Sequence, residues 1–195
     1  MRIVTGSLKG RSIPFNPRRH GEIRVTSARL KEAVFSMLGP LAGRSFLDLC
    51  AGSGQIALEA YSRGARVTAC EPDGRRYRML RELLRAWGVD ERLQLSNRKA
   101  QALISGTDGP YDGVYVDPPY EAALGGRPLS LALAEQVALS GMLGSRGMMF
   151  VQHPGSLQLP DSLDSLRLER RRPSGDSAVS VYVAASADAP GSQEG

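Results

Sequence analysis

The chain has 195 residues, of which 42% are hydrophobic and 23% charged. This is the size and composition of one folded domain, and it excludes wholesale disorder, collagen and a coiled coil. No apolar run reaches the roughly 20 residues of a membrane helix, and the first residues lack the apolar core of a secretory signal, so we expect a cytoplasmic protein. The two cysteines and two histidines match no zinc-ligand pattern, and no metal is expected.

The formal net charge of +5 is concentrated near the start of the chain. Residues 1–31 contain eight arginines and lysines but only one glutamate. A basic segment of this kind favours a phosphate backbone as partner, although a solvated surface can have the same composition. We therefore treat residues 1–25 as a basic extension with nucleic acid as a candidate partner.

The first predicted elements are a small hairpin and a helix. Residues 2–4 and 11–13 are strand-like runs on either side of a glycine-bounded turn, and a loop rich in proline and arginine follows. A helix is expected after Thr26 or Ser27, either of which can cap it, and ends before residues 39–40, Gly-Pro.

From residue 45 onward, short apolar runs alternate with helical patterns. Strands are predicted at 45–50, 66–70, 92–95, 113–116 and 148–152, and helices at 55–62, 73–87 and 128–139. Such alternation is typical of a mostly parallel sheet covered on both faces. Residues 165–172 and 178–184 follow each other without a helix and are expected to pair antiparallel. The main domain is thus predicted over 26–184, with a disordered tail over 185–195.

Residues 46–54 read FLDLCAGSG and lead from a predicted strand into a predicted helix. Gly52 and Gly54 allow a tight turn and the close approach of a ligand to the backbone. The third glycine of the dinucleotide fingerprint is absent, because Ala57 occupies its position. Asp48, just before the loop, would either brace the loop backbone or contact an amino group of a cofactor.

An acidic residue also follows the next predicted strand. Glu71 comes 17 residues after Gly54, near the spacing at which such folds bind ribose hydroxyls. The alternative for Glu71, and the preferred interpretation of Asp73, is an acid that favours the start of a helix. Cys50 and Cys70 are interpreted as small buried apolar residues.

The tetrapeptide Asp117-Pro118-Pro119-Tyr120 directly follows the predicted strand 113–116. The prolines end the strand, so the Asp117 carboxylate and the Pro118 carbonyl would lie at the edge where open α/β sheets bind ligands. An aromatic exocyclic amine is a poor nucleophile and has two N–H donors. The Asp117 carboxylate and the Pro118 carbonyl could each accept one of these N–H groups and so hold the nitrogen toward a methyl donor. Tyr120 would stack on the base. The alternative is a rigid loop with a helix-capping aspartate.

These motifs resemble those of a known family. Residues 117–120 resemble the [DN]PP[YFW] signature of amino-group methyltransferases that use S-adenosylmethionine, and residues 47–54 resemble their cofactor loop. Over residues 1–184 the chain resembles the RsmD family of bacterial 16S rRNA guanine-N2 methyltransferases. The opening residues are similar to that family's N-terminal hairpin, and its first helix motif is matched by Arg24, Thr26, Arg29, Glu32, Phe35 and Leu38.

The resemblance implies a Rossmann-like class I methyltransferase fold. This is an α/β fold with a seven-stranded, mostly parallel sheet whose last strand is antiparallel, helices on both faces and a small N-terminal β-hairpin. It also implies methyl transfer from S-adenosylmethionine to the N2 amine of a guanine in 16S rRNA. The partner would be 16S rRNA or an assembly particle of the small ribosomal subunit, and the enzyme a monomer.

The family motifs imply three groups of site residues. The catalytic residues would be Asp117, Pro118, Pro119 and Tyr120. The cofactor would be bound by Asp48, Ala51, Gly52, Ser53, Gly54, Glu71 and Asn97. The RNA would be contacted by Arg11, Arg18, Arg19, Arg24 and Thr26.

The chain departs from the family pattern at three places. Val25 replaces a proline, which affects the path into the first helix. Lys99 occupies the position of the usual adenine-contacting residue, so Asn97 or the backbone of Arg98 is assigned that contact. His153 stands next to the position of a frequent acid and is interpreted as a satisfied histidine rather than as a proton carrier.

Three other functions remain open from the sequence. A DNA adenine or cytosine amino-methyltransferase would use the same tetrapeptide, but the chain has no room for a separate target-recognition domain. A non-catalytic RNA-binding assembly factor would not need to bind S-adenosylmethionine, which calorimetry can test. A dinucleotide-dependent oxidoreductase is disfavoured by the missing third glycine and by the Asp117 motif.

Overall fold

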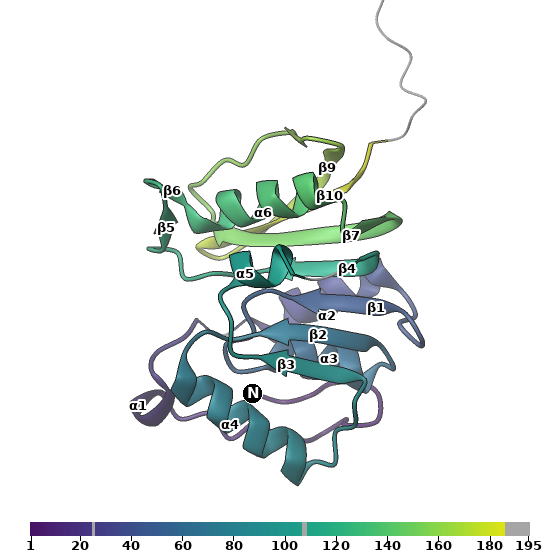
Figure 1. Ribbon diagram of the computed structural model, residues 1–195, viewed down its shortest axis with the longest axis vertical. Helices are drawn as coiled ribbons and strands as arrows, with labels where there is room; N and C mark the ends of the chain where they lie inside the picture. Colours follow the sequence, from purple (N-terminus) through teal and green to yellow (C-terminus); the bar gives the residue numbers. More distant parts are fainter. Residues whose placement is uncertain (25, 107–108, 186–195) are drawn as a thin grey trace, which may run out of the picture.

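The computed structural model describes residues 1–24, 26–106 and 109–185. Val25 and the predicted tail from residue 186 onward lie outside the described residues. Over the described part, the main sheet has eight strands in the order β3-β2-β1-β4-β7-β10-β9-β8 (Figure 1). The strands are β1 (Ser45–Asp48), β2 (Arg66–Cys70), β3 (Leu93–Ser96), β4 (Tyr111–Val116), β7 (Leu143–Pro154), β8 (Ser162–Leu163), β9 (Leu166–Ser174) and β10 (Ser177–Ala184).

Strand direction agrees with the prediction. Strands β3, β2, β1, β4 and β7 run parallel to one another, and β10 pairs antiparallel with both β7 and β9. The predicted number of seven strands is one too few for the described residues, because the two-residue strand β8 extends the edge beside β9. A pairing this short leaves no alternation in the sequence from which it could be predicted.

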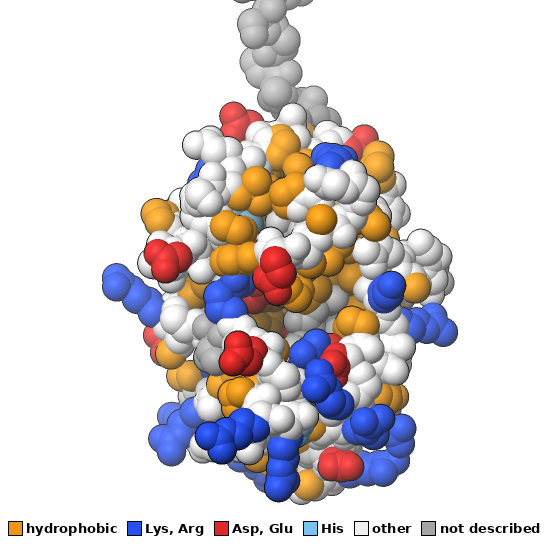
Figure 2. All heavy atoms as spheres, turned by 90° about the vertical axis from the view of Figure 1, so that its left-hand side faces the viewer, with side chains coloured by type: hydrophobic (Ala, Val, Ile, Leu, Met, Phe, Trp, Pro, Cys, Tyr) orange, Lys and Arg blue, Asp and Glu red, His pale blue; other side chains and the backbone are white. Residues whose placement is uncertain are grey.

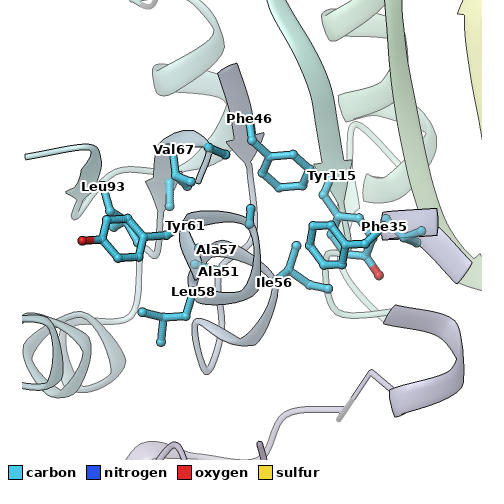
Figure 3. Packing of buried hydrophobic residues seen from close by; sticks show 14 of the residues in the cluster. Phe35, Phe46, Ala51, Ile56, Ala57, Leu58, Tyr61, Val67, Leu93 and Tyr115 are labelled. Atoms are coloured by element: carbon cyan, nitrogen blue, oxygen red, sulfur yellow. The ribbon is translucent and has the colours of Figure 1, made fainter. Parts of the chain in front are cut away.

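Helices cover both faces of the sheet. The helices α2 (Ala28–Leu38), α3 (Gln55–Ser62) and α4 (Gly74–Ala86) contribute to one apolar cluster, and α5 (Ala100–Ile104) and α6 (Leu129–Ser140) to the other. Successive strand residues point to opposite faces, which places Phe46 and Tyr115 in the first cluster and Leu47 and Val114 in the second. Figure 3 shows Phe35 of α2 near Phe46, with ring centres 5.9 Å apart. None of the helices in the described residues is long and apolar enough to cross a membrane.

Two of the predicted helix caps are confirmed. The Ser27 hydroxyl accepts the amide N–H of Leu30 at 3.1 Å, and the Asp73 carboxylate accepts those of Arg75 and Arg76 at 2.9 and 3.1 Å. A side-chain acceptor at this position satisfies an amide that has no partner within the helix. Asp73 is therefore the helix-capping acid that its position predicted.

The N-terminal segment is less regular than a hairpin. Where two strands were predicted, the structure has one antiparallel bridge, between Arg2 and Ser12, supported by hydrogen bonds such as that from the Ile3 amide to the Arg11 carbonyl. The predicted loop contains a single helical turn, α1 (Pro17–His20), which packs against α4. A small hairpin, β5 (Ala123–Leu124) and β6 (Arg127–Pro128), follows the strand β4 and its loop.

A buried carboxylate, that of Glu59, fastens this segment to the sheet domain and also forms an ion pair within that domain. The Lys31 ammonium lies 3.0 Å from the Glu59 carboxylate, and neither side chain is more than 1% exposed. The same carboxylate accepts the amides of Val4 and Thr5 at 2.9 and 3.0 Å. Both carboxylate oxygens of Glu59 thus have hydrogen-bond donors. A buried charge is tolerated when it is paired and hydrogen-bonded in this way.

Candidate active site

The predicted site residues follow two neighbouring parallel strands. Strands β1 and β4 pair so that Asp48 lies opposite Tyr115, and the chain leaves both strands at the same edge of the sheet. Figure 2 views the side of the molecule that carries α1 and the β5–β6 hairpin, and it shows a hollow surrounded by acidic and basic side chains. Lysine and arginine side chains gather below this hollow, in the part that contains α1 and α4 (Figure 2).

The glycine loop after β1 has the predicted sharp turn. Gly52 and Gly54 have φ angles of 54° and 79°, in the left-handed region that favours glycine. A Cβ on Gly54 would lie 2.4 Å from the Cδ2 atom of Leu80, whereas a Cβ on Gly52 would meet no atom closer than 3.9 Å. Gly54 is thus required by packing, and Gly52 leaves room beside the backbone.

Asp48 braces this loop. Its carboxylate accepts the amides of Cys50 at 3.2 Å and Ala57 at 3.1 Å, which connects the end of β1 to the first turn of α3. Burial raises the pKa of Asp48 to about 7 against the lowering effect of these amides, and the charges of Asp117 and Glu71 raise it further. Three carboxyl groups are therefore close enough to interact at this edge.

Glu71 connects the glycine loop that follows β1 to the start of α4. Its carboxylate accepts the amides of Gly52 and Asp73, both at 2.8 Å, and lies 3.0 Å from the Arg76 guanidinium. The Asn97 amide group donates to the carbonyls of Glu71 and Pro72 at 2.8 and 3.1 Å. Both side chains hold backbone that follows β1 or β2, and their contacts with a ribose and an adenine stay predictions.

Asp117 is paired with an arginine from the N-terminal segment. The Arg24 Nη2 atom donates to the Asp117 carboxylate at 2.5 Å, and the side chains are 33% and 11% exposed respectively. Burial raises the pKa of Asp117 to about 7, although the positive charge of Arg24 and hydrogen bonds from Arg24 and Thr26 lower it. The structure therefore brings together two residues predicted to bind RNA, Arg24 and Thr26, with the predicted catalytic carboxylate.

Tyr120 completes this site. The central guanidinium carbon of Arg24 lies 3.2 Å from the centre of the Tyr120 ring, so the cation covers the face of the ring. The Tyr120 hydroxyl oxygen is buried and has no hydrogen-bond partner within the described part of the chain. We call Asp117, Tyr120 and the space between them the amine slot.

Buried residues that were not predicted connect the amine slot to the glycine loop. Gln55, the residue after Gly54, donates from its side-chain amide to the Thr26 carbonyl at 3.2 Å, and both residues are buried. The Tyr115 hydroxyl donates to Gln152 at 2.6 Å. The position of Gln55 directly after the glycine loop was the only sequence signal for its role.

The remaining predicted RNA contacts lie away from the amine slot. Arg11 packs over Trp87, next to the end of α4, at 5.4 Å from the ring centre, and donates to the Trp87 carbonyl at 3.2 Å. Arg18 and Arg19 are exposed on α1, which packs against α4. Arg18 and Arg19, on α1 beside the first turn of α4, belong to what we call the basic surface below the hollow, whereas Arg11 lies at the other end of α4.

His153 is a satisfied buried histidine. Its two ring nitrogens lie 2.8 Å from the Pro154 carbonyl and 2.9 Å from the Ser180 hydroxyl. Burial lowers its pKa, which favours the neutral ring. Within the described residues, no group of three or more histidine, cysteine, aspartate or glutamate side chains could hold a metal ion.

Comparisons with known proteins agree with this fold. The chain is 30% identical to ribosomal RNA small subunit methyltransferase D of Escherichia coli strain K12, over 93% of this chain and 89% of the relative. A solved hypothetical protein of Thermus thermophilus is 26% identical, with a TM-score of 0.77 over 95% of this chain and 99% of that one.

A more distant structure shows the fold alone. The C-terminal domain of precorrin-6Y C5,15-methyltransferase from Rhodobacter capsulatus is 15% identical, with a TM-score of 0.58 over 84% of this chain and 92% of that chain. The predicted Rossmann-like class I methyltransferase fold is confirmed. The model of the family described as "Conserved hypothetical protein 95" matches residues 1–183. Because that match spans nearly the whole chain, the protein belongs to this family, the RsmD family that its motifs resemble.

Proposed function

We propose that the protein methylates the exocyclic N2 amine of a guanine in small-subunit ribosomal RNA, with S-adenosylmethionine as methyl donor. The observation that carries this proposal is the position of Asp117 and Tyr120 beside the glycine loop, at the common edge of β4 and β1. The name of the Escherichia coli relative supports rRNA as the substrate class.

The site residues suit the proposed cofactor. S-adenosylmethionine would supply an electrophilic methyl group on a positively charged sulfur. A Cβ on Gly52 would make only ordinary contacts, with Cys50 and Ile23 at 3.9 Å, so a ligand could approach the backbone there. The interacting carboxyl groups of Asp48, Glu71 and Asp117 would favour a cation beside this loop. Glu71 would accept ribose hydroxyls in addition to the two amides that it holds.

The amine slot would prepare the guanine amine for reaction. The Asp117 carboxylate and the Pro118 carbonyl would each accept one N–H of the amine, which orients the nitrogen lone pair toward the methyl carbon. With its lone pair so directed, the amine nitrogen would form a bond to the methyl carbon while the carbon–sulfur bond of the donor breaks, and the electron pair of that bond would stay on sulfur. The positive charge that develops on nitrogen is stabilised by Asp117, and the amine releases one proton to Asp117 or to water.

The RNA would reach the slot across the basic surface below the hollow. Arg18 and Arg19 lie on this side, and guanidinium groups bind phosphate oxygens well. The target base would leave its stack, at a cost of a few kcal/mol. Stacking on Tyr120 would offset about 1 to 3 kcal/mol of that cost.

Product mapping tests this function directly. Purified protein is incubated with isotopically labelled S-adenosylmethionine and either naked 16S rRNA or small-subunit particles, and the RNA is digested to nucleosides for mass spectrometry. We expect labelled N2-methylguanosine at one position. Label on adenine or cytosine, or no label in either RNA substrate, would contradict the proposal.

Calorimetric titration with S-adenosylmethionine separates an enzyme from a binding factor. We expect saturable binding by the wild-type protein. A Gly52→Val variant should lose this binding, because the side chain would block the approach of the ligand to the backbone and strain a residue with a φ angle of 54°. RNA binding without any cofactor binding would identify a non-catalytic assembly factor instead.

A further inference from the structure

The amine slot already contains a group that resembles its proposed substrate. The Arg24 guanidinium is flat, carries N–H donors and covers the Tyr120 ring at 3.2 Å while it donates to Asp117 at 2.5 Å. A guanine held for methylation would make the same two kinds of contact, one with the ring face and one with the carboxylate. Arg24 and the target base therefore compete for the same two partners.

We propose that Arg24 occupies the amine slot until a target nucleotide displaces it, and that Arg24 thereby determines which nucleic acids enter the site. This inference rests on the proposed function and adds a specificity-determining residue to it. Arg24 lies 93 positions before Asp117 in the chain, so the contact is a property of the fold and not of the loop that carries the tetrapeptide.

The displaced guanidinium needs a new partner. A charged side chain that leaves a nearly buried carboxylate loses a strong charge-assisted hydrogen bond, and a phosphate oxygen offers an equivalent one. A nucleotide within an RNA strand brings phosphates on both sides of the target base. A free nucleoside brings none, so it would have to expel Arg24 without compensation.

The position of Arg24 supports this exchange. Its side chain is one-third exposed, so it can leave the slot without opening the core. It belongs to the basic extension, residues 1–25, and comes three residues before the cap of α2 at Ser27. RNA bound along the basic surface would therefore present its phosphates close to the residue that has to move.

The test uses 2-aminopurine riboside, a fluorescent nucleoside that carries an exocyclic amine but no phosphate. Its emission is quenched when it stacks on an aromatic ring. We expect weak quenching with the wild-type protein and about tenfold tighter binding with Arg24→Ala, because removal of one cation–π contact and one ion pair removes the competitor. Arg24→Lys should give an intermediate affinity, since an ammonium keeps the charge without the flat face.

Two control variants locate the effect. Arg29→Ala removes an exposed arginine from the first turn of α2, for which no ion pair is present within the described residues, and should bind the nucleoside as the wild type does. In the Arg24→Ala background, Asp117→Asn should abolish the gain, which shows that the nucleoside is in the amine slot. The Asp117 carboxyl should also ionise at higher pH in Arg24→Ala, because a neighbouring positive charge has gone.

Equal nucleoside affinity in the wild type and in Arg24→Ala would overturn the inference. The same holds for a gain that persists after Asp117→Asn. The proposed function is judged separately, by the labelled nucleoside formed from RNA by the wild-type enzyme. That activity can be present while Arg24→Ala shows no gain, and the two ideas therefore fail independently.

Discussion

Two aspartates lie at opposite ends of the strand β4, and each is paired with an arginine, yet they lie in different surroundings. Asp112, near the start of the strand, is 40% exposed, lies 3.3 Å from Arg44 and accepts the amide of Ser45. Asp117, just beyond the end of the strand, is 11% exposed, and burial raises its pKa to about 7. An aspartate–arginine pair thus connects two surface segments at one edge of the sheet. At the other edge, the aspartate of such a pair has a pKa close to neutral pH.

The two aspartates differ because they lie at opposite edges of the sheet, and not because their arginine partners differ in kind. At the edge where β1, β2 and β4 end, the loops leave a hollow in which carboxyl groups are close to one another. At the opposite edge, Asp112 shares a hollow of about 450 Å³ with Arg44 and Arg146. Water can reach that carboxylate, which weakens its electrostatic coupling.

A third pair extends the comparison to full burial. Replacement of Glu59 by glutamine would leave the Lys31 ammonium buried without a counter-charge. We expect a loss of about 3 to 5 kcal/mol in the free energy of unfolding, measured by urea denaturation. Asp112→Asn should cost less than about 1 kcal/mol, as for other exposed pairs.

A second substitution tests the cause of this loss. Lys31→Met in the Glu59→Gln background removes the unpaired charge and should restore part of the stability. Similar losses for Glu59→Gln and Asp112→Asn would show that burial does not rank these pairs.

Substitution of the two aspartates at the ends of β4 should have very different effects on the rate of methyl transfer. Asp117→Asn removes a carboxylate that stabilises developing charge, and we expect the rate constant of methyl transfer to RNA to fall by about 100- to 1000-fold. The affinity for S-adenosylmethionine, measured by calorimetry, should change little. Asp112→Asn should keep the rate within about twofold, and an Asp117→Asn enzyme that is nearly as fast as the wild type would refute the role of Asp117.

The raised pKa values predict a smaller, pH-dependent effect on stability. Asp48 and Asp117 have ordinary pKa values near 4 when unfolded and about 7 when folded. The folded state therefore holds more protons between these values, so their contribution stabilises the protein at low pH and is lost as the pH rises from about 4 to about 7.

Denaturation at several pH values measures this contribution. The difference in unfolding free energy between the wild type and Asp48→Asn should change over this pH range and level off above about pH 7. A flat difference for Asp48→Asn would show that the carboxyl group titrates as it does in water.

The smallest expected effect concerns the basic surface below the hollow. Glutamine at both Arg18 and Arg19 should weaken RNA binding and reduce the slope of log affinity against log salt concentration by about 2, because two fewer phosphates are neutralised. The matched control replaces Arg170 and Arg172, which are exposed on β9 at the other end of the sheet. An unchanged slope for the first variant, or an equal reduction for both, would place the RNA elsewhere.

Local patterns in the sequence predicted most of the fold. Helix α3 and strand β2 have the predicted limits, 55–62 and 66–70, because turn residues and a change of periodicity mark both ends. Helices α1 and α5 were not predicted, since four or five residues are too few to establish a helical period. The predicted N-terminal strands reduce to one bridge, because buried contacts with α3 replace most of the ladder there.

From the sequence, only those parts of the site could be predicted that are formed by residues adjacent in the chain. The glycine loop and the Asp117 tetrapeptide are local, and the parallel order of β1 and β4 brings them together. The contact of Arg24 with Asp117 and Tyr120, and the link from Gln55 to Thr26, join residues that are distant in the chain. Such contacts depend on side-chain packing that no periodicity encodes.

The way in which the first residues are anchored limits how the protein can be engineered. Ile3, Leu8 and Ile13 are almost wholly inaccessible to water and lie in the same apolar cluster as Phe35 and Phe46. Deletion of the basic extension would uncover this cluster and leave the Glu59 carboxylate without two of its amide donors. Transfer of RNA recognition to another enzyme by grafting these residues would therefore require the underlying helices as well.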